Sequence, residues 1–203
     1  MPSLWIAEKP LVLASKSRSR QALLASAGIP FMAQPADIDE RALEEDFAGA
    51  GGDEVARRLA GAKAMSVSEH YAGRLVLGAD QTLSLDATVF SKPFDAEAAA
   101  RQIETLAGKT HVLHSAICLV CDGEVLFEAA PQARLTMRPL SSAFIARYVE
   151  AAGPAILDSV GAYQLEGLGI HLFDRVEGDH STILGLPLIE LLGFLRAHGS
   201  LAA

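Results

Sequence analysis

The sequence predicts an α/β protein built on a mixed β-sheet, and three observations support this class. Segments with helical spacing of apolar residues alternate with strand-like runs in the first half of the chain. Strand-like runs follow one another in the middle, where Asp122 and Gly123 give a strong hairpin signal. The 203 residues, 50% of them hydrophobic, suffice for one well-buried globular or bilobed domain, so we expect a single domain over residues 1–203.

Charge and cysteine content limit the function. Lys and Arg total 17 against 25 Asp and Glu, a net charge of -8, which argues against nucleic-acid polymers as partners. A negatively charged substrate would therefore need a local basic pocket.

The N-terminus lacks the apolar core of a signal peptide, two cysteines cannot form a disulfide framework, and no apolar run approaches the roughly 20 residues that span a bilayer. We expect a cytoplasmic protein without a membrane partner.

The first regular unit is a short strand followed by a helix. Residues 11–14 are small or apolar and suit a buried strand. Ser17 is a candidate N-cap of the helix, because its hydroxyl can accept a hydrogen bond from an amide of the first turn. Gly28 is a candidate stop.

The charges at the start of this helix are unusual. Arg18 and Arg20 fall in the first turn, where the helix dipole already places partial positive charge. A bound anion would compensate, since free amides, two guanidiniums and several hydroxyls converge there. The hydroxyls belong to Ser15, Ser17 and Ser19. The alternative is a solvated basic turn in a surface loop.

A second helix is expected after a strand and an acidic segment. Residues 31–36 suit the strand, and Glu40 lies in the acidic segment, which is compatible with a solvated loop. Asp53 is a candidate N-cap for a helix over residues 53–67. Lys63 falls on the apolar edge of that helix, which suggests a buried stem with the ammonium on a carboxylate or phosphate. Snorkelling of the side chain to solvent explains the same position.

Residues 74–86 describe a central strand with an embedded carboxylate. Asp80 would cost several kcal/mol if it were buried without a partner, so it needs a cation, a metal or the end of the strand. Lys92 directly precedes Pro93, which favours an extended or turning backbone. Asp95 can cap the helix that follows.

The second half continues with strands and two further helices. Strands are expected over residues 111–120, 124–129 and 133–137, as an antiparallel meander. A helix ends near Gly153, the glycine-rich residues 158–187 suggest a loop plus a hairpin near a site, and Pro187 suits the start of the final helix.

Common motifs of other enzyme classes are missing. The sequence has no G-x-x-x-x-G-K-[ST] and no complete G-x-G-x-x-G. Cys118 and Cys121 lack a second Cys or His pair, which disfavours zinc. No G-x-S-x-G supports a serine hydrolase.

Eight segments in order resemble the Maf family of nucleoside triphosphate pyrophosphatases, from about residue 11 to residue 195. They are LASKSRSRQALL, the Glu40 segment, RLAGAKA, GADQTLSLD, SKP, HVLHSA, and YQLEGLG with GLPL. The resemblance implies a bilobed α/β fold of the Maf and inosine-triphosphatase type, with a long mixed sheet and a cleft between two lobes. It also implies dependence on Mg²⁺ or Mn²⁺, hydrolysis of a nucleoside triphosphate to the monophosphate and pyrophosphate, and a homodimer.

The resemblance carries site residues over by position. Ser15 and Arg20 match a phosphate-contacting serine and the family's second arginine, Lys63 and Lys92 match cleft lysines, and Glu40 and Asp80 match acidic residues, Asp80 being the proposed proton acceptor. Our hypothesis is attack of water on the α-phosphorus, with Mg²⁺ held by the two carboxylates and the cations neutralising the leaving group. Asp80 would orient or deprotonate the water.

Two departures from the family pattern concern the basic turn and the second helix. Arg18 and Ser19 stand where proline and then arginine are usual, so the role of Arg18 stays open. Ala62 stands where a glutamate often precedes the cleft lysine.

Three positions that the resemblance associates with base selectivity fall on Ser19, Gln81 and Glu166. Members of the pyrimidine type tend to have Arg, Thr and Gln there, and members of the 7-methyl-GTP type Trp, Gln and Glu. This chain matches the second type at two positions, and a carboxylate suits the N1 and N2 donors of guanine. We expect a 7-methyl-GTP pyrophosphatase. The alternatives are a dTTP/UTP pyrophosphatase and a non-enzymatic regulator, since Maf proteins have been linked with septum formation.

Overall fold

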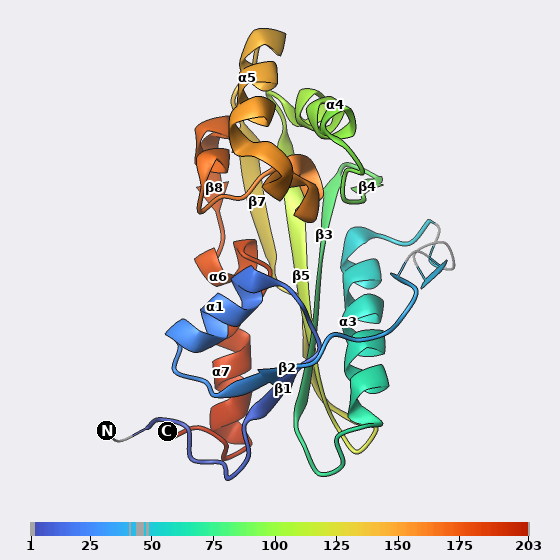
Figure 1. Cartoon of the computed structure of the whole chain (residues 1–203), viewed down its shortest axis with the longest axis vertical. Helices are drawn as coiled ribbons and strands as arrows, with labels where there is room; N and C mark the ends of the chain where they lie inside the picture. Colours follow the sequence, from blue (N-terminus) through green and yellow to red (C-terminus); the bar gives the residue numbers. More distant parts are fainter. Residues whose placement is uncertain (1–2, 41, 44–46, 48, 203) are drawn as a thin grey trace.

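A mixed sheet forms the centre of the protein. The computed structural model describes residues 3–40, 42–43, 47 and 49–202. Within them, eight strands form one sheet in the order β2-β1-β3-β5-β7-β8, with β4 paired to β3 and β6 to β5 (Figure 1). The strands are β1 (Leu11–Leu13), β2 (Phe31–Ala33), β3 (Val76–Leu85), β4 (Thr88–Phe90), β5 (Thr110–Cys121), β6 (Glu124–Ala129), β7 (Gln132–Met137) and β8 (Phe173–Glu177). The predicted α/β class with a long mixed sheet is confirmed.

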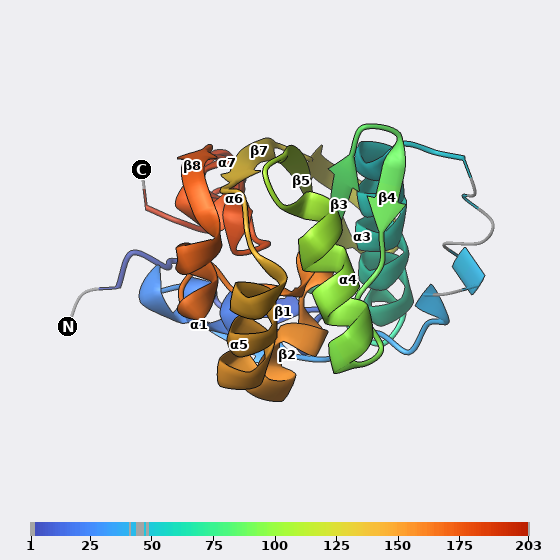
Figure 2. The same cartoon turned by 90° about the horizontal axis from the view of Figure 1, so that it is seen from above.

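Helices lie on both faces of the sheet. They are α1 (Arg18–Ser26), α3 (Gly52–Ser68), α4 (Ala96–Leu106), α5 (Ser142–Ala152), α6 (His180–Ile183) and α7 (Leu188–Ala197), with 3₁₀ turns η1 (Gly153–Asp158), η2 (Val160–Ala162) and η3 (Leu168–Leu172). α1 and α3 lie on opposite sides of β3 and β5 (Figure 1, Figure 2). None of the helices described is long and apolar enough to cross a membrane.

Two apolar clusters share the long strands. One joins the start of β3 to β1, α1 and α7 and contains Leu77, Leu24 and Leu191. The other joins the end of β3 to α4 and α5 and contains Leu83 and Ile103. α4 and α5 accordingly lie at one end of the long strands, while β1 and α7 lie near the other (Figure 1). The two clusters thus lie toward opposite ends of the long strands, and the middle of β3 lies between them.

The structure corrects three local expectations. Asp53 does not cap α3, whose N-cap is Gly51; the carboxylate lies in the first turn and pairs with Arg57 one turn later. The predicted antiparallel meander is not formed, because β6 and β7 both pair with β5 instead of with each other. Pro131, between β6 and β7, has no amide hydrogen for a β-ladder. The prediction of a hairpin within residues 158–187 is also wrong.

That glycine-rich segment holds one strand, β8, which pairs with β7 instead of with a neighbour in the same segment. The residues before β8 form the 3₁₀ turns η2 and η3. Gly161 and Ala162 both have positive φ angles, 78° and 59°, which bend the chain where a strand would have to be extended.

Close packing of α3 on β3 depends on Gly78. A Cβ atom at this position would lie 2.0 Å from the carbonyl oxygen of Ala60 and 2.9 Å from the Cβ of Ala64, both on α3. A glycine is therefore required for the helix to lie this close to the strand. This contact sets the height of α3 over the middle of β3.

We expect Gly78→Ala to lower the free energy of unfolding by about 3 kcal/mol, because the added methyl group must push α3 away from the sheet. Urea denaturation measures this change. Gly193→Ala in α7 is the matched control: its Cβ would meet nothing within 4 Å, so stability should change by less than about 1 kcal/mol. Equal effects of the two substitutions would contradict the packing argument.

A buried histidine makes the fold sensitive to acid. His111 is fully buried, its Nε2 is 2.8 Å from the hydroxyl oxygen of Tyr163, and burial lowers its pKa from 6.5 to about 4. The unfolded chain therefore binds a proton that the folded protein does not, so stability falls as the pH drops from 6.5 to about 4.

This loss should amount to about 3 kcal/mol. Because glutamine does not titrate, His111→Gln should show a correspondingly flatter decline of unfolding free energy between pH 7 and pH 4. Urea denaturation across this range measures both proteins. The same pH dependence in variant and wild type would show that His111 does not contribute.

Candidate active site

The candidate site lies along one edge of β3. β1 pairs with this edge as far as Leu77 and β4 pairs with it from Leu83 onward, while β5 occupies the opposite edge. In the part of the chain that the structure describes, no strand pairs with the first edge between those points. We call this stretch, residues 78–82, the open edge. Because side chains alternate along a strand, Asp80 faces α3 and Gln81 faces α6.

Lys63 joins two carboxylates at the open edge. Its ammonium donates hydrogen bonds to Oδ1 of Asp80 at 2.6 Å and to Oε2 of Glu40 at 2.8 Å. The side chains of Lys63 and Asp80 are only 9% and 10% exposed, whereas Glu40 is 45% exposed. The expectation that the stem of Lys63 is buried and its ammonium meets a carboxylate is confirmed, and snorkelling is not the explanation.

The electrostatics of Glu40 follow from this cluster. Partial burial would raise its pKa, but the hydrogen bond and the charge of Lys63 outweigh that effect, with Lys92 and Arg20 acting in the same direction. The pKa of Glu40 therefore lies below its ordinary value, and the carboxylate stays ionised at neutral pH.

Arg20 crosses to the open edge from the other face. Ser17 caps α1 as predicted, with its hydroxyl accepting from the amide of Arg20 at 3.4 Å. The guanidinium donates through Nε to the carbonyl of Gly185 and through Nη1 to the carbonyl of Ala79, both at 2.8 Å, and also through Nη1 to the hydroxyl of Ser15 at 3.2 Å. Two protein carbonyls thus fix one side of the group.

The second terminal nitrogen of Arg20, Nη2, has no hydrogen-bond partner among the residues described. Burial lowers the pKa of this guanidinium, the charges of Asp80 and Glu40 act in the opposite direction, and arginine stays protonated in proteins. Arg18, in contrast, is exposed. Of the two arginines in the first turn, the structure therefore fixes only Arg20.

Ser19 and Glu166 meet across 147 residues of chain. The hydroxyl of Ser19 donates to Oε1 of Glu166 at 3.2 Å. Gln81 lies on the same side of the sheet, where its amide nitrogen donates to the carbonyls of Thr182 and Ile183 at 3.1 and 3.0 Å.

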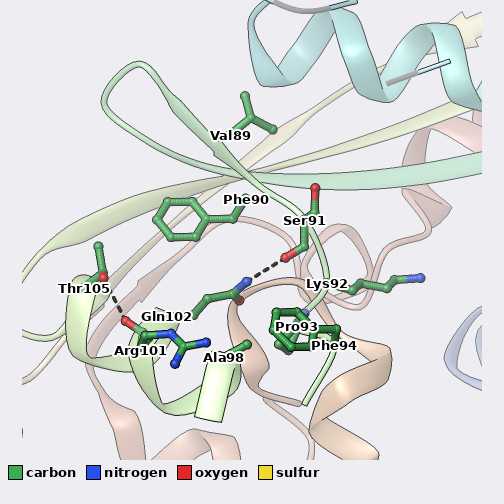
Figure 3. Close-up of a pocket in the computed structure, with 10 residues that line it drawn as sticks. All are labelled: Val89, Phe90, Ser91, Lys92, Pro93, Phe94, Ala98, Arg101, Gln102 and Thr105. Atoms are coloured by element: carbon green, nitrogen blue, oxygen red, sulfur yellow. Dashed lines mark hydrogen bonds between the residues drawn. The ribbon is translucent and has the colours of Figure 1, made fainter. Parts of the chain in front are cut away.

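Lys92 is the least constrained of the predicted residues. It follows β4 and is exposed, and its charge acts on Glu40 without a direct hydrogen bond. Lys92 is one of the residues that line a hollow of about 370 Å³, together with Phe90, Pro93 and Gln102, and Figure 3 shows its side chain directed away from the ring of Phe90. The structure thus brings the charge of Lys92 near Glu40 while its side chain stays exposed.

The carboxylates can be tested as metal ligands. Oε1 of Glu40 and Oδ2 of Asp80 have no hydrogen-bond partner among the residues described, so each acid keeps one oxygen available while the other binds Lys63. Mg²⁺ is usually held by one or two carboxylates together with substrate phosphates and water. The described residues contain no cluster of three or more His, Cys, Asp or Glu side chains able to hold a metal.

Sequence reasoning missed the groups that hold Arg20 and Gln81 in place. Four of them are backbone carbonyls, of Ala79, Thr182, Ile183 and Gly185, which no side-chain motif can reveal. Ser115 is the exception. Its hydroxyl accepts from Gln81, and it lies in the HVLHSA segment, which gave the only available signal.

Comparison with known proteins gives a consistent result. The family model described as "Maf-like protein" matches residues 10–198. A "Nucleoside triphosphate pyrophosphatase" of Rhodopseudomonas palustris (strain HaA2) is 56% identical over 200 residues, which cover 98% of this chain and 99% of that protein. A "7-methyl-GTP pyrophosphatase" of Brucella abortus biovar 1 (strain 9-941) is 53% identical over 188 residues, 92% of this chain and 94% of that protein. The family match spans nearly the whole chain, and the chain belongs to the Maf family.

Proposed function

We propose that the protein hydrolyses a nucleoside triphosphate, with 7-methyl-GTP preferred, to the nucleoside monophosphate and pyrophosphate. One observation carries this proposal: the Lys63 ammonium lies between the carboxylates of Asp80 and Glu40 at the open edge that Arg20 reaches from the other face. This combination offers cations for a polyphosphate and carboxylates for a water molecule within one site. The names of the relatives described above support the same reaction class.

The cations prepare the triphosphate for cleavage. Nη2 of Arg20 is free to donate to a phosphate oxygen, and the hydroxyl of Ser15 lies beside the same guanidinium. The side chain of Lys92 is exposed, so its ammonium can reach the phosphates of a bound nucleotide. Negative charge grows on pyrophosphate as the bond to the α-phosphorus breaks, so fixed cations here stabilise the transition state more than the ground state.

Asp80 accepts a proton from the attacking water molecule. Lys63 fixes its Oδ1, which leaves Oδ2 to accept a proton from water in line with the leaving pyrophosphate. Glu40 shares the same ammonium from the exposed side and completes the acidic pair. When bound, Mg²⁺ or Mn²⁺ would be held by Oε1 of Glu40 together with oxygens of the substrate phosphates and would neutralise phosphate charge, which leaves Oδ2 of Asp80 to the water.

Base selection falls to Ser19, Gln81 and Glu166. Ser19 donates to Oε1 of Glu166, which leaves the second carboxylate oxygen to accept a hydrogen bond from the base. Guanine offers two neighbouring donors, N1 and N2, and the cationic ring of 7-methylguanine adds an attractive charge. Uracil and thymine offer a single donor and suit this acceptor less well.

Release of pyrophosphate from a panel of 7-methyl-GTP, GTP, UTP and TTP tests the function. With Mg²⁺ or Mn²⁺ we expect the highest kcat/KM for 7-methyl-GTP, and no release in the presence of a chelator. Preference for UTP or TTP would leave the enzyme class intact but overturn the base assignment. Failure to release pyrophosphate from any nucleotide would favour a nucleotide-responsive regulator instead.

A further inference from the structure

A buried serine holds the side-chain amide of Gln81. Ser115 is fully buried on β5 and is the register partner of Gln81 on β3, so the two side chains share one face of the sheet. The hydroxyl of Ser115 accepts from Nε2 of Gln81 at 2.8 Å and donates its own proton to the carbonyl of Thr182 at 2.6 Å. Nε2 also donates to the carbonyls of Thr182 and Ile183.

This arrangement permits only one orientation of the amide. The carbonyls of Thr182 and Ile183 lie at the end of the short helix α6, and that of Thr182 also accepts from the amide of Gly185 at 3.0 Å. Carbonyl oxygens accept and cannot donate, and the only proton of the Ser115 hydroxyl is already engaged. All three oxygens can therefore accept from the NH₂ group of Gln81, and none of them has a proton to donate to its amide oxygen. A flipped amide would place its oxygen against two carbonyl oxygens and a hydroxyl lone pair.

The opposite end of the amide faces the site. A Cβ atom on Gly185 would lie 3.6 Å from Oε1 of Gln81 and 3.6 Å from both Nε and Nη2 of Arg20, so the amide oxygen and the guanidinium border the same space. Oε1 has no hydrogen-bond partner among the residues described. It therefore offers an acceptor to the part of the nucleotide that lies beyond the phosphates bound by Arg20.

We propose that Ser115 is a positioning residue for substrate selection, which holds the oxygen of the Gln81 amide toward the nucleotide so that position 81 selects a hydrogen-bond donor of the base. This inference rests on the proposed function, because it takes the ligand to be a nucleotide. It adds a basis for substrate choice to that function. Two acceptors, Oε1 of Gln81 and the second carboxylate oxygen of Glu166, would select a base edge with two donors, such as that of guanine.

Ser115→Ala tests the inference. Without the hydroxyl, the amide loses one of its three acceptors and Thr182 loses a donor, so the amide oxygen is held less firmly. The ratio of kcat/KM for 7-methyl-GTP to that for UTP should fall roughly threefold to tenfold, the size of one hydrogen bond. The kcat for UTP should change by less than about twofold, because the catalytic groups are untouched.

A double-mutant cycle shows whether Ser115 acts through Gln81. Gln81→Met keeps the length of the side chain without an acceptor, and in that background Ser115→Ala should no longer change the ratio. Ser84→Ala is the matched control, since it removes another buried hydroxyl, bonded to His114, from the other face of the sheet. It should leave the ratio as in the wild type.

Binding constants for non-hydrolysable analogues of the same two nucleotides, measured by calorimetry, give the ratio independently of turnover. They keep the test decisive even if the wild-type protein releases no pyrophosphate. An equal loss for both nucleotides, or an unchanged effect of Ser115→Ala in the Gln81→Met background, would overturn the positioning role. A wild type that binds the two analogues equally well would overturn it as well.

Discussion

Asp80→Asn is expected to lower kcat about a thousandfold while leaving the fold intact. Asn has nearly the same shape and its oxygen can still accept from Lys63, so the contact at Oδ1 is preserved. The neutral amide cannot take a proton from water. Pyrophosphate release at saturating 7-methyl-GTP measures kcat, and the thermal unfolding midpoint reports on the fold.

Asp86→Asn is the matched control for this substitution. Asp86 is exposed in the turn between β3 and β4, and its φ of 52° is a conformation that Asn adopts readily. Both substitutions remove one negative charge from neighbouring parts of the chain, but Asp86 is exposed and lies outside the site. We expect unchanged kcat for Asp86→Asn. A near-normal kcat for Asp80→Asn would show that another group accepts the proton.

The sequence predicted the parts of the fold that depend on local patterns. The alternation of helices and strands, the Ser17 cap and the Asp95 cap each reflect residues close together in the chain, and all three are present. The hairpin predicted within residues 158–187 was wrong, because glycines indicate bends in the chain but do not determine which strands pair. There β8 pairs with β7, a choice that tertiary packing makes.

The candidate site shows the same division. The sequence indicated Lys63 as a charged residue on an apolar helix edge and Asp80 as a carboxylate inside a strand. The 2.6 Å distance between Nζ of Lys63 and Oδ1 of Asp80, however, depends on how α3 lies over β3. Gly78 permits that approach, and its role is visible only when Ala60 is in place. The open edge of β3 likewise arises from the different lengths of β1 and β3, which no motif records.

Arg20→Ala should raise the KM for the triphosphate at least about tenfold, because the free Nη2 donor makes a charge-assisted hydrogen bond that alanine cannot replace. The substitution also leaves the carbonyls of Ala79 and Gly185 without their donor, so stability should fall. Steady-state kinetics and thermal unfolding separate the two effects. Arg20→Lys restores the charge but not the planar fork, and an intermediate KM is expected.

Arg18→Ala separates local contact from overall charge. Arg18 and Arg20 lie in the same turn of α1 and carry the same charge, so removing either changes the net charge of the protein equally. Long-range attraction of a polyanion would therefore weaken to a similar extent in both variants. Only Arg20 is fixed at the open edge, so its loss should raise KM far more than the loss of Arg18. Equal increases would mean that the basic turn attracts nucleotides without binding a phosphate through Arg20.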